Sequence, residues 1–485
     1  MSVGPYQDIT FDRDGDVDAA DRTRLLGLDC TDLVMFAHGW NNSPREAARL
    51  FSAFFAPFPG LLGPGVRMGY AGIVWPSMRF TDEPVPAPSR AAAGRWPVAA
   101  GSVPVRGGAR IPPPGERIAL DVATRMALQG LFPGHEATVA RLAALLELRP
   151  DRADAFAEFG RLARQLAEAP PGGLGNCFGQ DLPQEEMGPP ALLYEDVLTL
   201  CREFSAALET ARPGGFPGAV PGPGTGGGPG GLPQPGGLPG GPAGGGAPVS
   251  PPASPRGFRD GRADGPDRLW RGAKELLRQT TYYALKRRAG AVGELGLGPL
   301  LGQLARSRPG LRVHLVGHSQ GARLVAFALR GLPDGARNVK SVTLLQGAFS
   351  HYAFAPSLPH AAQRSGALGA LEQRVDGPVV ACYSRHDSAL GVLYPLASRL
   401  ARDERYGSAQ DRRWWAVGHD GLRAVVPSVR LTLEEALGRG VPGSGCVSVD
   451  TASVVRCGGP PAGAHNDICH RELARVVVAA GRVGR

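Results

Sequence analysis

The sequence RVHLVGHSQGARLVAFAL, from Arg312 to Leu329, contains the most specific pattern in the chain. The apolar residues of 313–316 are typical of a short buried strand. Gly-His-Ser-Gln-Gly follows at 317–321, and apolar residues then repeat at helical spacing to the end of the quoted sequence. Strand, Gly-x-Ser-x-Gly and helix in this order predict a nucleophile elbow, the sharp turn that presents a reactive serine.

Two glycines make such a turn possible. Side chains two positions before and after Ser319 would collide, and Gly317 and Gly321 have no Cβ atom. We therefore expect the Ser319 hydroxyl to lie at the tip of the turn, with His318 completing the elbow. The backbone N–H of Gln320, in the first turn of the helix, can bind a developing oxyanion. A purely structural turn is the alternative, because this chain is rich in glycine.

Length and composition bound the class of protein. A chain of 485 residues can hold one large α/β domain with an insertion, or two domains. Its 70 glycines and 46 prolines exceed average usage and predict a sizeable segment that does not pack. The net charge of +9 comes almost entirely from scattered arginine, without alternating arginine and aromatic residues. We therefore expect no nucleic-acid partner.

The cysteines and the hydropathy pattern point to the cytoplasm. The 7 cysteines are dispersed and form no Cys-x-x-Cys pair, so we expect reduced thiols and no zinc or redox site. The first residues have neither the basic nor the apolar region of a signal peptide. No apolar run reaches the length of about 18 residues that a membrane span needs, so we expect no transmembrane segment.

A second apolar run, Leu33–Ala37, is typical of a central parallel strand. His-Gly-Trp follows it directly, and Ser-Pro-Arg-Glu at 43–46 then has the features of a capped helix start. Open α/β sheets bind ligands at the carboxyl ends of their strands. We expect Gly39 to allow close backbone approach and the Trp40 N–H to point at a substrate oxygen. A plain connection between strand and helix is the alternative.

Further strands and helices alternate along the chain and predict an α/β fold, with a mostly parallel central sheet and helices on both faces. Residues 1–80 and 258–485 are expected to form this core. The other predicted strands are Gln7–Phe11, Gly69–Trp75, Val342–Leu345 and Val379–Tyr383; the predicted helices run from Leu269 to a stop at Gly290 and from Leu473 to Ala480.

Residues 81–212 interrupt this alternation and are expected to form a helical insertion. Apolar residues at helical spacing predict one helix around 139–146 and another around 156–166. These helices are either a cap over the strand ends or a peripheral pair, and the sequence favours neither. The Gly/Pro-rich stretch 213–257 has almost nothing to bury, so we expect a disordered linker there.

A serine nucleophile needs a base, and the base needs a carboxylate that orients it. In the chain order Ser, Asp, His, the acid follows a strand after the elbow and the histidine lies in a late loop. Asp387 and His465 meet these two conditions. His419, which Asp420 follows directly, is the competing base. The position of His465 in a loop that opens the final helix favours it.

These motifs together resemble the α/β-hydrolase superfamily. The resemblance covers roughly residues 5–80 and 267–485, and the stretches around Tyr282 and around 346–352 are similar to uncharacterised bacterial lipase- or esterase-like members. It implies a small-molecule or lipid-like acyl substrate, with ester, thioester and amide left open. It implies neither a metal nor an organic cofactor.

The resemblance also implies a role for each residue. Ser319 attacks a carbonyl carbon, His465 carries the proton, and Asp387 fixes the imidazole tautomer. The N–H groups of Trp40 and Gln320 hold the oxyanion. The expected activity is therefore that of a serine hydrolase acting on a carboxylic ester.

The alternative function is a non-catalytic binding or scaffold protein on the same fold, with the Gly/Pro-rich stretch recruiting partners. A complete set of Ser, Asp and His in the right order speaks against it. A nucleotide-dependent enzyme such as a kinase finds no support, because the chain has no Gly-x-x-x-x-Gly-Lys-Ser/Thr loop and no His-Arg-Asp or Asp-Phe-Gly motif. Oligomeric state is not predictable from these patterns.

Overall fold

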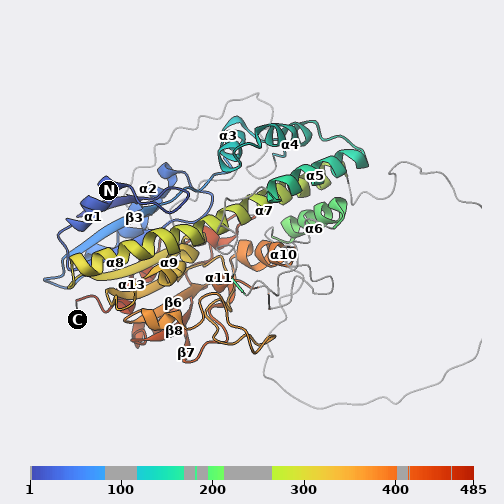
Figure 1. Cartoon of the computed structure of the whole chain (residues 1–485). Helices are drawn as coiled ribbons and strands as arrows, with labels where there is room; N and C mark the ends of the chain where they lie inside the picture. Colours follow the sequence, from blue (N-terminus) through green and yellow to red (C-terminus); the bar gives the residue numbers. More distant parts are fainter. Residues whose placement is uncertain are drawn as a thin grey trace, which may run out of the picture.

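The sheet is the frame on which the other elements pack (Figure 1). The computed structural model describes residues 3–81, 117–168, 181–182, 195–211, 265–400, 413, 415–459 and 461–484. Within these residues, eight strands form one open sheet in the order β1-β3-β2-β4-β5-β6-β8-β7. Every neighbouring pair is parallel, so the predicted α/β fold with a mostly parallel sheet is confirmed.

The predicted apolar runs form strands of this sheet. The strands are β1 (Tyr6–Thr10), β2 (Asp32–Ala37), β3 (Met68–Val74), β4 (Arg312–His318), β5 (Val339–Leu345), β6 (Pro378–Tyr383), β7 (Ser428–Thr432) and β8 (Gly445–Asp450). All side chains of β2 are buried, because helices cover both faces of the sheet. The edge strand β7 is largely exposed, and its sequence gave no comparable apolar signal.

The chain leaves the two central strands in opposite directions. From β2 it continues to β3 on one side, and from β4 it continues to β5 on the other side. The loops after β2 and β4 therefore diverge and leave a crevice between them at the carboxyl edge of the sheet. Such a topological switch point is where open α/β sheets bind their ligands.

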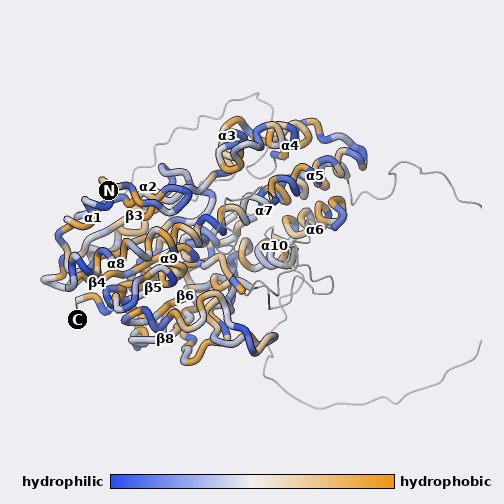
Figure 2. The backbone as a smooth tube through the Cα atoms, in the orientation of Figure 1, coloured by the Kyte–Doolittle hydropathy of each residue, from blue (hydrophilic) through white to orange (hydrophobic). Residues whose placement is uncertain are grey.

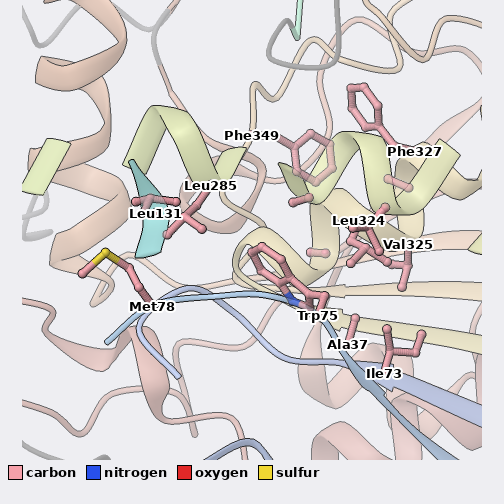
Figure 3. Packing of buried hydrophobic residues seen from close by; sticks show 14 of the residues in the cluster. Ala37, Ile73, Trp75, Met78, Leu131, Leu285, Leu324, Val325, Phe327 and Phe349 are labelled. Atoms are coloured by element: carbon pink, nitrogen blue, oxygen red, sulfur yellow. The ribbon is translucent and has the colours of Figure 1, made fainter. Parts of the chain in front are cut away.

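Helices cover both faces of the sheet. The helices are α1 (Ala19–Leu26), α2 (Pro44–Phe55), α3 (Val122–Leu131), α4 (Glu136–Leu148), α5 (Ala153–Glu168), α6 (Val197–Thr210), α7 (Pro266–Ala291), α8 (Gly298–Ser307), α9 (Gln320–Gly331), α10 (Tyr394–Leu400), α11 (Val417–Asp420), α12 (Leu433–Gly438) and α13 (Arg471–Ala480). Leu33, Met35 and Ala37 pack in one core with α1, α7, α8 and α9, whereas Val34 and Phe36 pack in the other with α2, α12 and α13. Figure 3 shows Leu324 and Val325 of α9 close to Ala37 and Ile73 of the sheet.

The prediction that Gly290 ends a helix is wrong. Helix α7 continues through a π-helical turn, η5 (Val292–Leu297), directly into α8. Glycine serves close packing in this region, because a Cβ on Gly293 would lie 2.2 Å from the carbonyl oxygen of Leu324 in α9. Glycine is unfavourable inside a helix, but here it allows the backbones of two helices to lie close together.

The insertion contains the predicted helical pair as α4 and α5, together with α3 and α6. Hydrophobic and hydrophilic residues alternate along these helices (Figure 2), and their hydrophobic residues join the core that contains α7. Both α5 and α6 pack against α7, the long helix that links this group to the sheet (Figure 1). The predicted Gly/Pro-rich linker, residues 213–257, lies outside the described residues.

Within the described residues, no helix combines the length and apolarity needed to cross a bilayer. Six described cysteines are free: Cys30, Cys201, Cys382 and Cys446 are buried, Cys469 is partly buried and Cys457 is exposed. The remaining cysteine, Cys177, lies outside the described residues.

Candidate active site

The Gly-x-Ser-x-Gly sequence forms a sharp turn between β4 and α9. Ser319 has φ 57° and ψ −119°, a backbone conformation that residues with a side chain rarely adopt. A Cβ on Gly317 would lie 2.3 Å from the Gly321 oxygen, and a Cβ on Gly321 would lie 2.2 Å from the Ala37 oxygen. Only glycine fits at both positions. At Gly317 the clash is within the turn, as the sequence predicts, whereas at Gly321 it is with the backbone at the end of β2.

Ser319 lines a pocket and is only 5% exposed. Its N–H donates to the Leu345 carbonyl of the neighbouring strand at 3.0 Å, which fixes the turn against the sheet. Gln320 begins α9, where the first backbone N–H groups have no partner within the helix. The side chain of Gln320 does not line the pocket, and its amide donates to the Tyr282 carbonyl at 3.2 Å.

Two hydrogen bonds connect the three residues that the sequence singled out. The distance between Ser319 Oγ and His465 Nε2 is 2.8 Å, and the distance between His465 Nδ1 and Asp387 Oδ2 is 2.7 Å. A carboxylate only accepts, so Nδ1 carries the proton of the neutral ring and Nε2 accepts from the serine hydroxyl. The structure thus brings together residues separated by 146 and 78 positions in the chain.

Asp387 is fully buried just beyond the end of β6. Its Oδ1 atom accepts from the Leu390 N–H at 2.9 Å, and its other oxygen remains for His465. Leu390 belongs to a π-helical turn, η7 (Ala389–Leu393), a rare conformation that is often found at functional sites. The backbone of Asp387 also forms an isolated antiparallel bridge with Gly463, which joins the acid to the loop that carries His465.

His318 supports the backbone at His465 through a hydrogen bond. Its Nε2–H donates to the His465 carbonyl oxygen at 2.8 Å, and the two rings are 4.9 Å apart. Burial lowers the pKa of His318 to about 3, with a smaller contribution from the nearby His465. His318 is therefore neutral at pH 7 and supports the loop through one hydrogen bond.

The loop after β2 lies directly against the serine. A Cβ on Gly39 would lie 2.7 Å from the Ser319 Cβ, so glycine is required at this close approach. His38 holds the loop: its Nδ1–H donates to the Gly39 carbonyl at 2.9 Å, and its own carbonyl accepts from Trp75 Nε1–H at 2.9 Å. Burial lowers the pKa of His38 to about 4. Trp40 follows and lines the pocket.

The pocket beside Ser319 has an apolar and a charged part. Tyr282, Ala348, Leu390 and Tyr394 belong to one buried apolar cluster, against which Trp40 packs. The charged part is formed by two pairs, Glu46 with Arg79 and Glu275 with Arg278. No residue of 117–168, 181–182 or 195–211 lines this pocket, so the described insertion helices support it indirectly, through their contacts with α7 and with η7.

His419, the competing base, has a different environment. Its ring lies edge-on to Trp415 with centroids 5.2 Å apart, and a Cβ on Gly391 would lie 2.7 Å from it. Burial lowers the pKa of His419. Among the described residues, the Nδ1 atom of His419 has no hydrogen-bond partner, and the histidine bonded to Ser319 is His465.

A second set of Ser, His and Asp lies at the opposite edge of the sheet. His314 Nε2 is 3.0 Å from Asp32 Oδ1, and His314 Nδ1 is 3.2 Å from Ser341 Oγ. These residues belong to the amino-terminal halves of β2, β4 and β5, and all three are buried. This set joins three strands, and it shows that residue types alone do not define a site.

The sequence reasoning missed most of the pocket wall. Glu275, Arg278, Gln279 and Tyr282 line the pocket from α7, where positions i, i+3, i+4 and i+7 share one helix face. This spacing was visible in the sequence as a polar stripe that ends in an aromatic residue. Tyr282 is both buried and part of the pocket wall.

No group of three or more His, Cys, Asp or Glu side chains that could hold a metal ion is found in the described part of the chain. Fold and site together define a class: an open parallel α/β sheet with hydrogen-bonded Ser, His and Asp side chains at its switch point. The chain matches no protein-family model, no curated protein and no solved structure at a significant level.

Proposed function

We propose that the protein is a serine hydrolase of the α/β-hydrolase superfamily that cleaves a carboxylic ester or a related acyl bond. The observation that carries the proposal is the continuous hydrogen-bonded series from Asp387 through His465 to Ser319, beside a pocket. Its chain order, with the serine on a strand–turn–helix, is that of α/β-hydrolases. The switch-point location of the pocket supports the same conclusion.

The chemistry starts with proton transfer. As Ser319 Oγ bonds to the carbonyl carbon of the substrate, its proton moves to His465 Nε2. The imidazolium that forms keeps its Nδ1–H bond to Asp387, which stabilises the positive charge. The negative charge on the substrate oxygen is held by the backbone N–H groups of Trp40 and Gln320.

Collapse of this intermediate breaks the bond to the leaving alcohol, which takes the proton from His465 and leaves an acyl group on Ser319. Water then gives a proton to His465 and attacks the acyl carbon. The acid leaves, and Ser319 recovers its proton from the imidazolium. Each proton is carried by the same ring nitrogen, which is why the distance between Ser319 and His465 matters.

A fluorophosphonate probe tests the proposal directly. We expect the probe to label the protein at Ser319, and Ser319→Ala to abolish both labelling and turnover of p-nitrophenyl esters, by about 10⁴- to 10⁶-fold. Ser341→Ala is the matched control, because Ser341 also contacts a histidine but lies at the other edge of the sheet. Folded protein that the probe does not label would refute the proposal.

The base is tested by a pair of histidine variants. His465→Ala is expected to lower kcat by about 10⁴-fold or more, because the serine loses its proton acceptor. His419→Ala is expected to retain most of the turnover, since the histidine that is hydrogen-bonded to Ser319 is His465. The reverse result, with turnover lost only in the His419 variant, would assign the base to His419.

A further inference from the structure

The pocket beside Ser319 is small. Its volume is about 90 Å³. For comparison, a buried apolar cavity of about 150 Å³ binds one benzene molecule. The space next to the serine therefore suits a group of a few carbon atoms and not an extended alkyl chain.

The apolar part of the pocket lies directly at the serine. The Ala348 N–H donates to the Ser319 carbonyl at 3.1 Å, and the Tyr282 hydroxyl donates to the Ala348 carbonyl at 3.0 Å. Leu390 and Leu393, on the turn that follows Asp387, close the space from the opposite element. A short apolar group on the carbonyl carbon would be in contact with these side chains.

The charged part of the pocket wall is unfavourable for a long alkyl chain. Arg278 pairs with Glu275 at 3.2 Å, and their side chains are only 12% and 3% exposed. Gln279 donates to the same carboxylate at 2.6 Å, and the Arg278 guanidinium lies 5.3 Å from the centre of the Trp40 ring. A long alkyl chain that crossed this wall would remove water from charged groups without replacing the lost interactions, which is unfavourable.

We infer that the substrates are esters of short acyl chains, of about two to four carbons, and not long-chain lipid esters. The inference rests on the proposed hydrolase function and assigns the substrate class of that site. The acyl group occupies the space bounded by Tyr282, Leu390 and Leu393. Leu390 and Leu393 set the upper limit of chain length.

A series of p-nitrophenyl esters from acetate to decanoate tests the inference on the full-length protein. We expect kcat/KM to be highest between acetate and butyrate and to fall by at least about tenfold at octanoate, because each methylene that does not fit costs binding in the transition state. A maximum at octanoate or decanoate would overturn the inference.

A variant pair locates the limit. Leu393→Ala enlarges the pocket, so the ratio of kcat/KM for hexanoate to that for acetate is expected to rise about tenfold. Leu396→Ala is the matched control, because Leu396 is similarly buried in the adjacent helix and does not line the pocket. An equal ratio in wild type and both variants would contradict the role of Leu393, and the ester series on wild type decides the inference if Leu393→Ala does not fold.

The fluorophosphonate experiment separates the two levels of failure. Labelling at Ser319 together with a long-chain maximum overturns the short-chain inference and leaves the hydrolase proposal in place. Absence of labelling and of ester turnover overturns both. Labelling with a short-chain maximum supports both.

Discussion

At the scale of single residues, the site depends on close contacts that leave no room for an added methyl group. Gly39 approaches Ser319 so closely that any Cβ would contact the serine side chain. His318 supports the loop of His465, and His38 supports the loop of Gly39, each through one hydrogen bond to a carbonyl. His318 and His38, which directly precede Ser319 and Gly39 in sequence, therefore support the loops around Ser319.

Gly39→Ala tests this close approach. The new Cβ would lie 2.7 Å from the Ser319 Cβ and 3.0 Å from His318 Nδ1, so either the serine or the loop must shift. Displacement of this kind is expected to lower kcat/KM for a p-nitrophenyl ester on the order of 10²-fold. Gly63→Ala is the control, because nothing lies within 4 Å of a Cβ at that position. Unchanged kcat/KM in Gly39→Ala would show that the contact is irrelevant to turnover.

Buried histidines predict a loss of stability in acid. Folding lowers the pKa of His38 from 6.5 to about 4 and that of His318 from 6.5 to about 3. Below pH 6.5 the unfolded chain therefore binds protons that the folded chain does not, and stability falls as the pH falls toward these lower values. Between pH 7 and pH 5 each group is expected to remove about 2 kcal/mol from the free energy of unfolding.

Urea unfolding at the two pH values measures this loss. His318→Gln keeps a donor for the His465 carbonyl but does not titrate, so its loss of stability between pH 7 and pH 5 is expected to be about 2 kcal/mol smaller than in wild type. His360→Gln serves as control, because His360 is exposed. Identical pH dependence in wild type and His318→Gln would contradict the effect of burial on the pKa of His318.

At the scale of elements, α7, η5 and α8 form one continuous helical segment. Its α7 part carries a wall of the pocket, and all three elements pack on α9. The elbow helix α9 is held between this segment and the sheet. The position of the serine therefore depends on how closely the two helices pack.

Two helical glycines are expected to respond in opposite ways to alanine. Gly293→Ala places a Cβ 2.2 Å from the Leu324 carbonyl and is expected to destabilise the protein by about 1–3 kcal/mol, because α9 must move. Gly130→Ala in α3 has nothing within 4 Å and is expected to stabilise by about 0.5–1 kcal/mol through helix propensity. Urea unfolding measures both, and stabilisation by Gly293→Ala would disprove the packing role.

At the scale of the whole molecule, Asp181 joins the insertion to the core. Its carboxylate accepts from Lys286 of α7 at 2.6 Å, from the Ser350 N–H at 3.0 Å and from the Tyr394 hydroxyl at 3.2 Å. It also binds Arg323 of the elbow helix. The residue is fully buried, so one carboxylate from the insertion connects elements on several sides of the pocket.

Asp181→Asn tests this connection. The substitution removes the negative charge that two buried cations contact and is expected to destabilise the protein by about 3–5 kcal/mol. Asp376→Asn is the control: it breaks an ion pair with Lys340 in which the two side chains are 56% and 25% exposed, and it is expected to cost less than about 1 kcal/mol. Equal losses in urea unfolding for the two variants would contradict a central role for Asp181.

Much of the frame could be read from residue order, because strands, helix starts and the elbow are local patterns. The strands β2 to β6 follow apolar runs, and the helix after β2 begins at Pro44 behind a Ser43 cap, as the sequence predicts. Ser319, Asp387 and His465 were singled out by their order in the chain, the first two by their positions after strands and His465 by its position in a loop that opens the final helix. The predicted stop at Gly290 is wrong because the helix continues past it; the nearby Gly293 serves close packing, and in sequence such a glycine looks the same as one that ends a helix.

The pocket and the choice among alternatives needed three-dimensional contacts. His465 and His419 are equal as residue types, and they differ because one loop bridges to Asp387 while the other ring is buried against Trp415. Likewise, in the described part of the chain, the Ser, His and Asp set around Ser319 lines the pocket, whereas the set around His314 joins three strands. Local patterns establish which elements form, because they depend on near neighbours; which distant side chains meet depends on how the sheet orders its strands, and that order is a property of packing across the whole chain.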